Sequence, residues 1–236
     1  MSFKLEVMLN SLKVASQYIG TTLAVSIASL LIGSLLGLLI ALVRFYKIKV
    51  FSQIFSVLIT VLKGVPIVLI LLAIYLILAK KMDGFAESLG WSLRFKNLNS
   101  IYIAIAALSV MATINSSEIF RGTLNSIGKG QQDAAKSIGM SSLQIIRRIL
   151  IPQSVPVALP MMSNLLIGLI KASALVSMVG AVDVFAAAKI SVQQNYRFLE
   201  AYIAVAIIYW GINIIIEQSS NLIEKNLNRR LRRDVA

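Results

Sequence analysis

The side chains that could carry chemistry in this chain of 236 residues are suited to binding rather than to making or breaking bonds. Cys and His are absent, which excludes thiol catalysis, disulfides, Cys or His metal sites and Ser-His-Asp hydrolysis. The 10 Asp and Glu leave few side chains from which another polar active site could be built. We therefore expect no catalysis, and neither a cofactor nor a metal in this chain.

One segment has the glycines and the lysine of a phosphate-binding loop, but their spacing is wrong. A nucleotide-binding loop needs four residues between its glycines and a Ser or Thr after the Lys, because that hydroxyl holds the magnesium ion. Here five residues separate Gly122 from Gly128, and Gly130 follows Lys129. If ATP drives transport, a different chain must therefore bind the ATP and magnesium and hydrolyse the nucleotide.

The most informative polar side chains interrupt long apolar segments, where burying them costs free energy. The Lys171 ammonium could bind a substrate carboxylate, and pairing with Asp183 or with a neighbouring subunit is an equal alternative. Asn164 lies seven residues before Lys171 on the same helical face, whereas Ser173 does not share that face. Asn164 could instead bond across helices. All three are candidates for a substrate pathway.

A second group of candidates lies earlier in the chain. Lys63 separates two apolar runs, so it either ends a membrane span or is a charge within the membrane. Pro66 follows Gly64 and Val65, and it predicts either a kinked helix or a flexible gate. The same two alternatives apply to three prolines spaced by four residues: Pro152, Pro156 and Pro160.

The composition indicates how these residues are positioned. Hydrophobic residues make up 58% of the chain and charged residues 14%, against about a quarter charged in a soluble domain. The sequence is therefore typical of an integral membrane protein, with lipid as a partner. The net charge of +13 comes from basic residues near span ends, which favours a topology signal over a nucleic-acid surface.

Charged residues divide the chain into five expected transmembrane helices. The spans lie at about 14–43, 58–79, 97–117, 149–182 and 201–223, in one all-α transmembrane domain covering residues 1–236. The turn after the first span, the long loop 118–148 and the tail together carry 13 Lys and Arg, and the opposite side carries 8. The positive-inside rule then predicts an N-terminus outside the cell and a cytoplasmic C-terminus.

The loop 118–148 has the local signals of two helices. The first is expected at 131–138, with Asp133 in its opening turn and Gly139 at a left-handed cap. The second should begin at Ser141, because Gln144 stands at capping-box distance, and should continue to Pro152. Ala134 and Ala135 leave little side chain on the first helix. This surface would let another backbone approach closely, and an amphipathic turn on the membrane is the alternative.

The loop and the residues around it resemble a known family. Asp133-Ala134-Ala135, Gly139, Ile149 and Pro152 resemble the cytoplasmic EAA loop of ATP-binding-cassette (ABC) importer permeases, with Asp in place of Glu. Between about residues 20 and 231, further elements follow the order of the polar amino-acid permeases for histidine, glutamine and cystine: Lys63-Gly64-Val65-Pro66, Glu118-Ile119-Phe120-Arg121-Gly122, Gly130-Gln131, Pro152-Gln153, Ala158-Leu159-Pro160, Asn164 and Lys171.

This resemblance implies a type I ABC importer permease in a bacterial cell membrane. The implied partners are an identical or sister permease, two ATPase subunits, which carry the ATP and magnesium, and an extracytoplasmic binding protein that delivers an amino acid. The helix at 131–138 would be the coupling helix that seats in the ATPase. The implied coupling residues are Gly130, Gln131, Asp133, Ala134, Ala135 and Gly139. The pathway residues would be Thr60, Lys63, Pro66, Asn164, Lys171 and Ser173.

Two departures from the family bear on the substrate. Ala172 follows Lys171 where relatives often have an acid, and Thr60 stands where Glu is common. The loss of both acids argues against cationic substrates and favours a neutral or zwitterionic amino acid such as cystine or glutamine. The alternative function is a self-sufficient secondary transporter or channel. The odd number of spans, the absence of a visible inverted repeat and the few intramembrane acids argue against it.

Overall fold

The computed structural model describes residues 3–92 and 94–233, and its regular elements there are all helical. The expected all-α fold is therefore confirmed. The α-helices are α1 (Leu5–Ser16), α2 (Ile19–Phe45), α3 (Lys49–Lys63), α4 (Ile67–Ser88), α5 (Ser100–Ser126), α6 (Lys129–Ser137), α7 (Ser142–Ile145), α8 (Ile151–Ala172), α9 (Val184–Ser191) and α10 (Phe198–Arg233). Short 3₁₀ or π turns are η1 (Phe95–Asn97), η2 (Ile146–Leu150) and η3 (Ser173–Val179).

Four continuous helical segments in the described part of the chain are long and apolar enough to cross a membrane. They are Ile19–Phe45, Ser100–Ser126, Ser142–Val179 and Phe198–Leu227. α3 and α4 together are also long and apolar enough, but the two helices meet at a bend of 108°. A fifth span exists if this bent pair counts as one crossing. The structure thus has four spans or up to five.

The second expected span is broken where the sequence placed a kink or a gate. α3 ends at Lys63 and α4 begins at Ile67. Pro66 has no backbone N–H and disfavours a helical conformation at Val65, so a continuous helix over 58–79 cannot pass through this point without loss of hydrogen bonds. Lys63 therefore lies at the end of α3, at the break between the two helices.

Helical structure extends further than the sequence pattern suggested. α5 continues to Ser126, so the first part of the 118–148 loop is helical in spite of Gly122. Buried Leu124 and the ion pairs of Glu118 with Arg44 and Arg121 stabilise this extension. α1 and α9 were not expected, and they pack against α10 in one apolar cluster that includes Ala15 and Val184.

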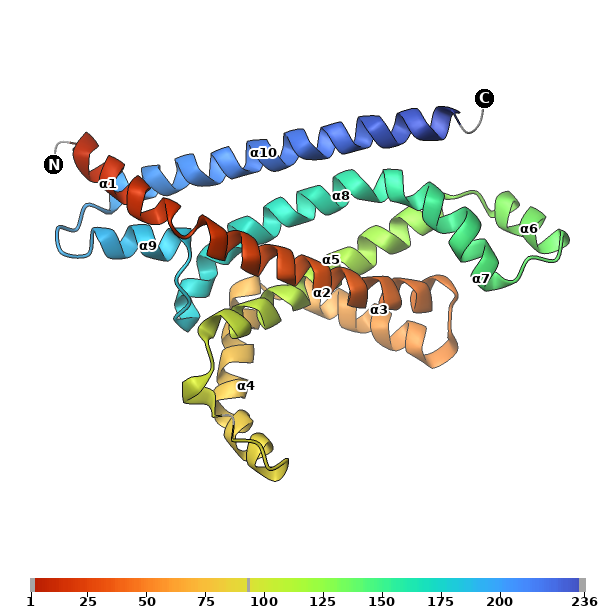
Figure 1. Ribbon diagram of the computed structural model, residues 1–236. Helices are drawn as coiled ribbons and strands as arrows, with labels where there is room; N and C mark the ends of the chain where they lie inside the picture. Colours follow the sequence, from red (N-terminus) through yellow and green to blue (C-terminus); the bar gives the residue numbers. More distant parts are fainter. Residues whose placement is uncertain (1–2, 93, 234–236) are drawn as a thin grey trace.

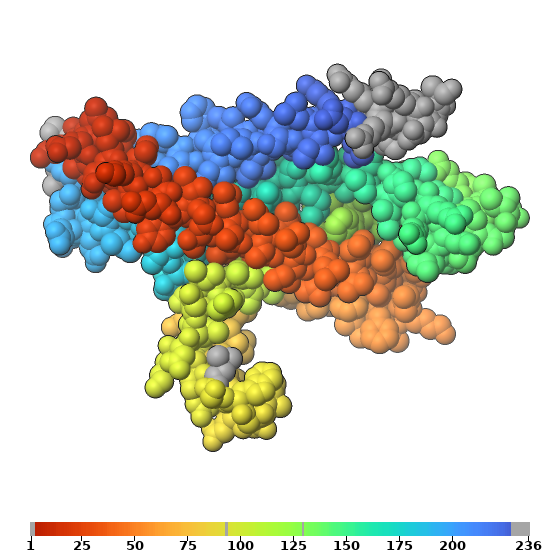
Figure 2. Space-filling model, in the orientation of Figure 1, coloured from red at the N-terminus to blue at the C-terminus, as the bar shows by residue number. Residues whose placement is uncertain are grey.

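The molecule is an elongated bundle (Figure 1). α6 and α7 lie at one end, and α1 and α9 lie at the other. α10 runs along the bundle from the α1 end to the α6 end, so the two ends of the chain lie far apart. α4 projects sideways from the bundle, and Figure 2 shows it as a separate arm.

The closest helix packing in the bundle joins α2 to α5. A Cβ atom placed on Gly33 would lie 2.2 Å from Ala112 Cβ, and one on Gly37 would lie 2.7 Å from Ser116 Cβ. Glycine is therefore needed at both positions, because any side chain would collide with α5. The four-residue spacing of these glycines serves packing within the chain, as small residues do at helix contacts in membranes.

Candidate functional site

The short helix α6 is attached to the bundle through one face. Ala135 is buried, and it packs in an apolar cluster with Leu124, Ile127, Ile145 and Leu150. Ala134, the preceding residue, is exposed, because neighbouring residues on an α-helix point about 100° apart. The two alanines therefore have different surroundings: Ala135 contacts this chain, and Ala134 is free to contact another molecule.

The start of α6 differs from the sequence expectation. The helix begins at Lys129 instead of residue 131, so the expectation that Asp133 lies in the opening turn was wrong. Asp133 lies in the second turn, where its carboxylate is 3.8 Å from the Lys136 ammonium. Gln131 is exposed beside Gly130, and its Oε1 accepts a hydrogen bond of 2.7 Å from Gln153 Nε2 of α8. This bond ties the first turn of α6 to the start of the long helix.

The connection from α6 to α7 follows the sequence signals. Gly139 has a φ of +81°, and its left-handed conformation is confirmed. The capping box is also confirmed: Ser141 Oγ accepts from the Gln144 backbone N–H at 3.3 Å, and the Gln144 side chain accepts from the Ser141 N–H at 2.8 Å. α7, η2 and α8 follow one another without a break.

Sequence analysis missed two apolar residues at this tip. Ile138 is 79% exposed and Leu143 is 73% exposed, although an apolar face containing Leu143 would be expected to pack inward. The buried residue of α7 is Ile145 instead. Ile138 follows Ala134 by four residues, a spacing that places both near one side of a helix and was the available signal for its exposure. The exposed side chains of Ile138 and Leu143 are apolar surface that a partner could cover.

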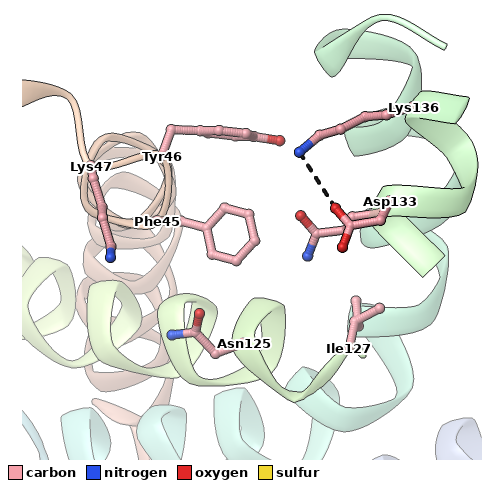
Figure 3. A pocket seen from close by; sticks show the side chains of 8 residues that line it. Phe45, Tyr46, Lys47, Asn125, Ile127, Asp133 and Lys136 are labelled. Carbon is pink, nitrogen blue, oxygen red and sulfur yellow. Dashed lines mark ion pairs between the residues drawn. The ribbon is translucent and has the colours of Figure 1, made fainter. Parts of the chain in front are cut away.

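A cavity of about 490 Å³ separates α6 from the end of α2 (Figure 3). Phe45, Tyr46 and Lys47 lie on one side of it, and Asp133 and Lys136 lie across from them. Desolvation raises the pKa of the Tyr46 phenol above its ordinary value. The α6 end is thus joined to the bundle through the cluster that contains Ala135, and the cavity lies between its Asp133 and Lys136 side and the end of α2.

The second group of candidates lies on α8. Asn164 and Lys171 are both exposed, which agrees with their placement on one helical face. The alternative in which Lys171 pairs with Asp183 was wrong, because Asp183 is buried and has other partners. Among the described residues, Lys171 has no ion-pair partner. A lysine facing lipid is costly, so this face needs a protein or water neighbour.

Asp183 is the centre of a buried polar cluster, although sequence analysis placed it in a polar connection. Its carboxylate caps α9 by accepting from the Ala186 N–H at 2.9 Å, and it accepts from Tyr209 OH at 3.0 Å and Ser173 Oγ at 3.2 Å. Burial raises the pKa of this carboxyl, and the three donors oppose that shift. Ser173 is fully buried and lines no open surface here.

The candidates near the α3–α4 break are exposed. The Thr60 hydroxyl donates to the Ser56 carbonyl at 2.8 Å, Lys63 ends α3, and Pro66 precedes the first residue of α4. Ile67 packs against the apolar cluster that contains Leu165, Leu169 and Ala172 of α8. Ile67, just after the break, and the α8 segment that carries Asn164 and Lys171 therefore contribute to one apolar cluster.

Comparisons with known proteins agree with this architecture. A profile of the family described as binding-protein-dependent transport system inner membrane component matches residues 12–232. The chain is 32% identical to the probable amino-acid permease protein YxeN of Bacillus subtilis, covering 96% of this chain and 97% of the relative. It is 30% identical to the L-cystine transport system permease protein TcyL of Bacillus subtilis, over 92% of this chain and 89% of that one.

A solved structure extends the likeness to three dimensions. A chain of an amino acid ABC transporter, crystallised with histidines, has a TM-score of 0.78 and 27% sequence identity, covering 96% of this chain and 100% of the other. The α6 helix, the bundle and the family profile thus agree, and the chain belongs to the family of binding-protein-dependent transport system inner membrane components, as a non-catalytic permease subunit of the amino-acid ABC importer type.

Proposed function

We propose that this chain forms the pathway for a neutral or zwitterionic polar amino acid, such as cystine or glutamine, and is moved by an ATPase that grips α6. The single observation that carries the proposal is the outward side of α6, where Ala134 is exposed while Ala135 holds the helix to the bundle. A helix fixed on one side and bare on the other can transmit a partner's motion.

The exposed face of α8 supports the pathway. Lys171 supplies a cation for a substrate carboxylate, and Asn164 on the same face supplies an amide donor and acceptor. Thr60, Lys63 and Pro66 line the neighbouring break between α3 and α4. Ser173 contributes to the pathway indirectly, because its hydroxyl donates a hydrogen bond to the Asp183 carboxylate and does not face the pathway. Neither Thr60 nor Ala172 adds a negative charge for a cationic side chain, which favours a zwitterion.

The complete transporter contains two permease subunits, identical or sister, whose α8 faces cover each other's polar residues. An extracytoplasmic binding protein delivers the amino acid. The single transmembrane domain, residues 1–236, is placed in the bacterial cell membrane with its N-terminus outside and its C-terminus and α6 in the cytoplasm. When ATP binds, the two ATPase subunits close and move both α6 helices. The cycle is driven because ATP binds the closed and open states of the ATPase pair with different affinities.

The test is uptake and ATP hydrolysis by the complex reconstituted in liposomes with its ATPase and binding protein. Ala134→Asp should abolish ATPase association and transport, because a bulky acid is added where another backbone approaches, while the chain still inserts. Gly139→Val should do the same, because a β-branched residue cannot adopt a φ of +81° without strain. Ser88→Asp, at an exposed position on α4 beyond the expected span 58–79, is the control for an added acid and should keep wild-type uptake.

A panel of amino acids in the same assay tests the substrate class. Cystine or glutamine should stimulate ATP hydrolysis more than arginine does, and a preference for arginine would contradict the zwitterion proposal. Wild-type uptake by Ala134→Asp would contradict the assignment of α6. Uptake by the permease without any ATPase would favour the secondary transporter or channel instead.

A further inference from the structure

A second cavity lies between α2, α3 and α5, and neither coupling nor the substrate pathway uses it. Its volume is about 400 Å³. The described residues that line it are four cations, two serines and a glutamine, with no acid: Arg44, Lys47, Lys49, Ser52, Gln53, Ser56 and Arg121.

The positive charge of this cavity exceeds the negative charge beside it. Arg44 and Arg121 share one carboxylate, that of Glu118, which Arg121 contacts at 2.9 Å. Lys47 and Lys49 have no ion-pair partner among the described residues. Four cations against one acid leave the cavity strongly positive, which favours an anionic ligand.

The hydrogen-bond donors at the cavity also outnumber the acceptors. Arg44 Nε donates to Ser56 Oγ at 3.2 Å, and the Ser56 hydroxyl donates to the Ser52 carbonyl at 2.7 Å, so these groups already have partners. Arg121 Nε is buried and has no acceptor among the described residues. A phosphate group, with several acceptor oxygens and a negative charge, matches such a site, because arginine and lysine are the usual partners of phosphate.

The place of the cavity in the bundle indicates the source of the phosphate. Arg44 lies in the last turn of a helix that spans the membrane, and α3 begins three residues after Tyr46, at Lys49. The first turns of α3 expose Val50, Phe51 and Ile54, each more than half exposed, which suits contact with lipid chains. The cavity therefore lies at the level where lipid headgroups meet the hydrocarbon, a position at which basic pockets between helices bind anionic lipids.

We infer that this cavity binds the phosphate headgroup of an anionic phospholipid. Lys47 also lines the cavity beside α6, so the lipid would contact a residue that borders the space between α2 and the coupling helix. The α2–α3 turn is built for this position: Lys47 has a φ of +50°, a left-handed conformation that few lysines adopt. The bound lipid fixes that turn between the bundle and α6.

The test measures binding of fluorescent phosphatidylglycerol to the purified permease complex in detergent, with phosphatidylcholine as the neutral comparison. The Lys47→Ala, Lys49→Ala double variant should bind phosphatidylglycerol roughly 30-fold more weakly, since each basic residue near an anionic headgroup contributes about fivefold. Ser52→Trp fills the cavity without changing its charge and should also weaken binding. The matched control, Lys80→Ala with Lys81→Ala on α4, removes the same charge elsewhere and should leave binding unchanged.

Each remaining outcome decides against the inference. Equal losses in the Lys47/Lys49 and Lys80/Lys81 variants would mean attraction by overall charge and no site. If inorganic phosphate or glycerol 3-phosphate displaced the lipid and bound as tightly as phosphatidylglycerol does, the ligand would be a soluble phosphate and not a lipid. Equal binding of phosphatidylglycerol and phosphatidylcholine by the wild type would overturn the inference directly. The melting temperature of each complex is measured in parallel, and Ser52→Trp decides the matter if the double variant fails to fold.

Discussion

The α2–α5 contact and the α6 helix both depend on small residues, but they use them differently. Gly33 and Gly37 lie in a long apolar helix, and α5 of the same chain fills the space that their missing side chains leave. Ala134 lies on a short polar helix, and no described residue covers it. A small residue thus marks close approach in both regions, and its surroundings tell whether the approaching surface belongs to this chain or to a partner.

The largest expected effect comes from breaking the α2–α5 contact. Gly33→Ala places a methyl group 2.2 Å from Ala112 Cβ and 2.7 Å from backbone atoms of α5, so the helices must move apart. We expect a loss of about 3 kcal/mol or more of stability, at the upper end of overpacking costs, measured as thermal unfolding in detergent. Gly211→Ala on α10 has open space at its Cβ and serves as the control, without loss. Unchanged melting of Gly33→Ala would contradict the close packing.

A smaller effect is expected where the α2–α5 contact ends near the coupling region. Glu118 pairs with Arg44, whose side chain is only 10% exposed, and with Arg121. Glu118→Gln keeps the shape but leaves both guanidinium groups without a counter-charge, which should cost about 1–3 kcal/mol by the same melting measurement. Glu87→Gln removes an exposed pair at 3.9 Å and should change nothing measurable. Equal effects of the two substitutions would show that Glu118 is not a structural link.

The smallest effect is expected on α6 itself. The Lys136–Asp133 pair is long, at 3.8 Å, and both side chains are more than 60% exposed. Lys136→Ala should therefore change stability by less than about 0.5 kcal/mol, because solvent screens such pairs. Ala135→Leu on the same helix is the contrasting variant, since it overfills the cluster around Leu150. If Lys136→Ala destabilised the protein more than Ala135→Leu, α6 would be attached through its charges and not through its apolar contact.

Local chemistry made the α6–α7 region predictable from sequence. A left-handed glycine and a capping box depend on residues within four positions of one another, so Gly139 and the Ser141–Gln144 pair could be recognised without tertiary information. The four unbroken spans were also accessible, because unbroken apolar length is a property of the sequence alone. The break at Pro66 followed from the missing backbone donor.

The features that sequence reasoning missed depend on contacts between distant segments. Asp183 directly follows the expected span 149–182, and the sequence does not show that it is a buried helix cap that also binds Ser173 and Tyr209. α1 and α9 are too short to be recognised without the cluster that joins them to α10. The end of α5 was misjudged because its Gly122 is compensated by the ion pair of Glu118 with Arg44 of α2 and by the pair of Glu118 with Arg121 within α5. The sequence likewise could not show which of the two adjacent alanines is exposed and which is buried, because this depends on the cluster that Ala135 contacts.

The unbroken run from α7 through η2 into α8 and η3 has a mechanical consequence. Beyond the π turn, α8 has 22 residues and corresponds to roughly 33 Å of helix, so a tilt of about 10° at that turn would displace its far end by about 6 Å. That displacement is comparable to the width of a small solute. The π turn at Ile146–Leu150 lies directly before α8. Its hydrogen-bond pattern is wider and less regular than that of an α-helix, so the angle between α7 and α8 can change there at the smallest cost in free energy. In the proposed mechanism, the reach of α8 is set by the number of residues between this turn and Lys171.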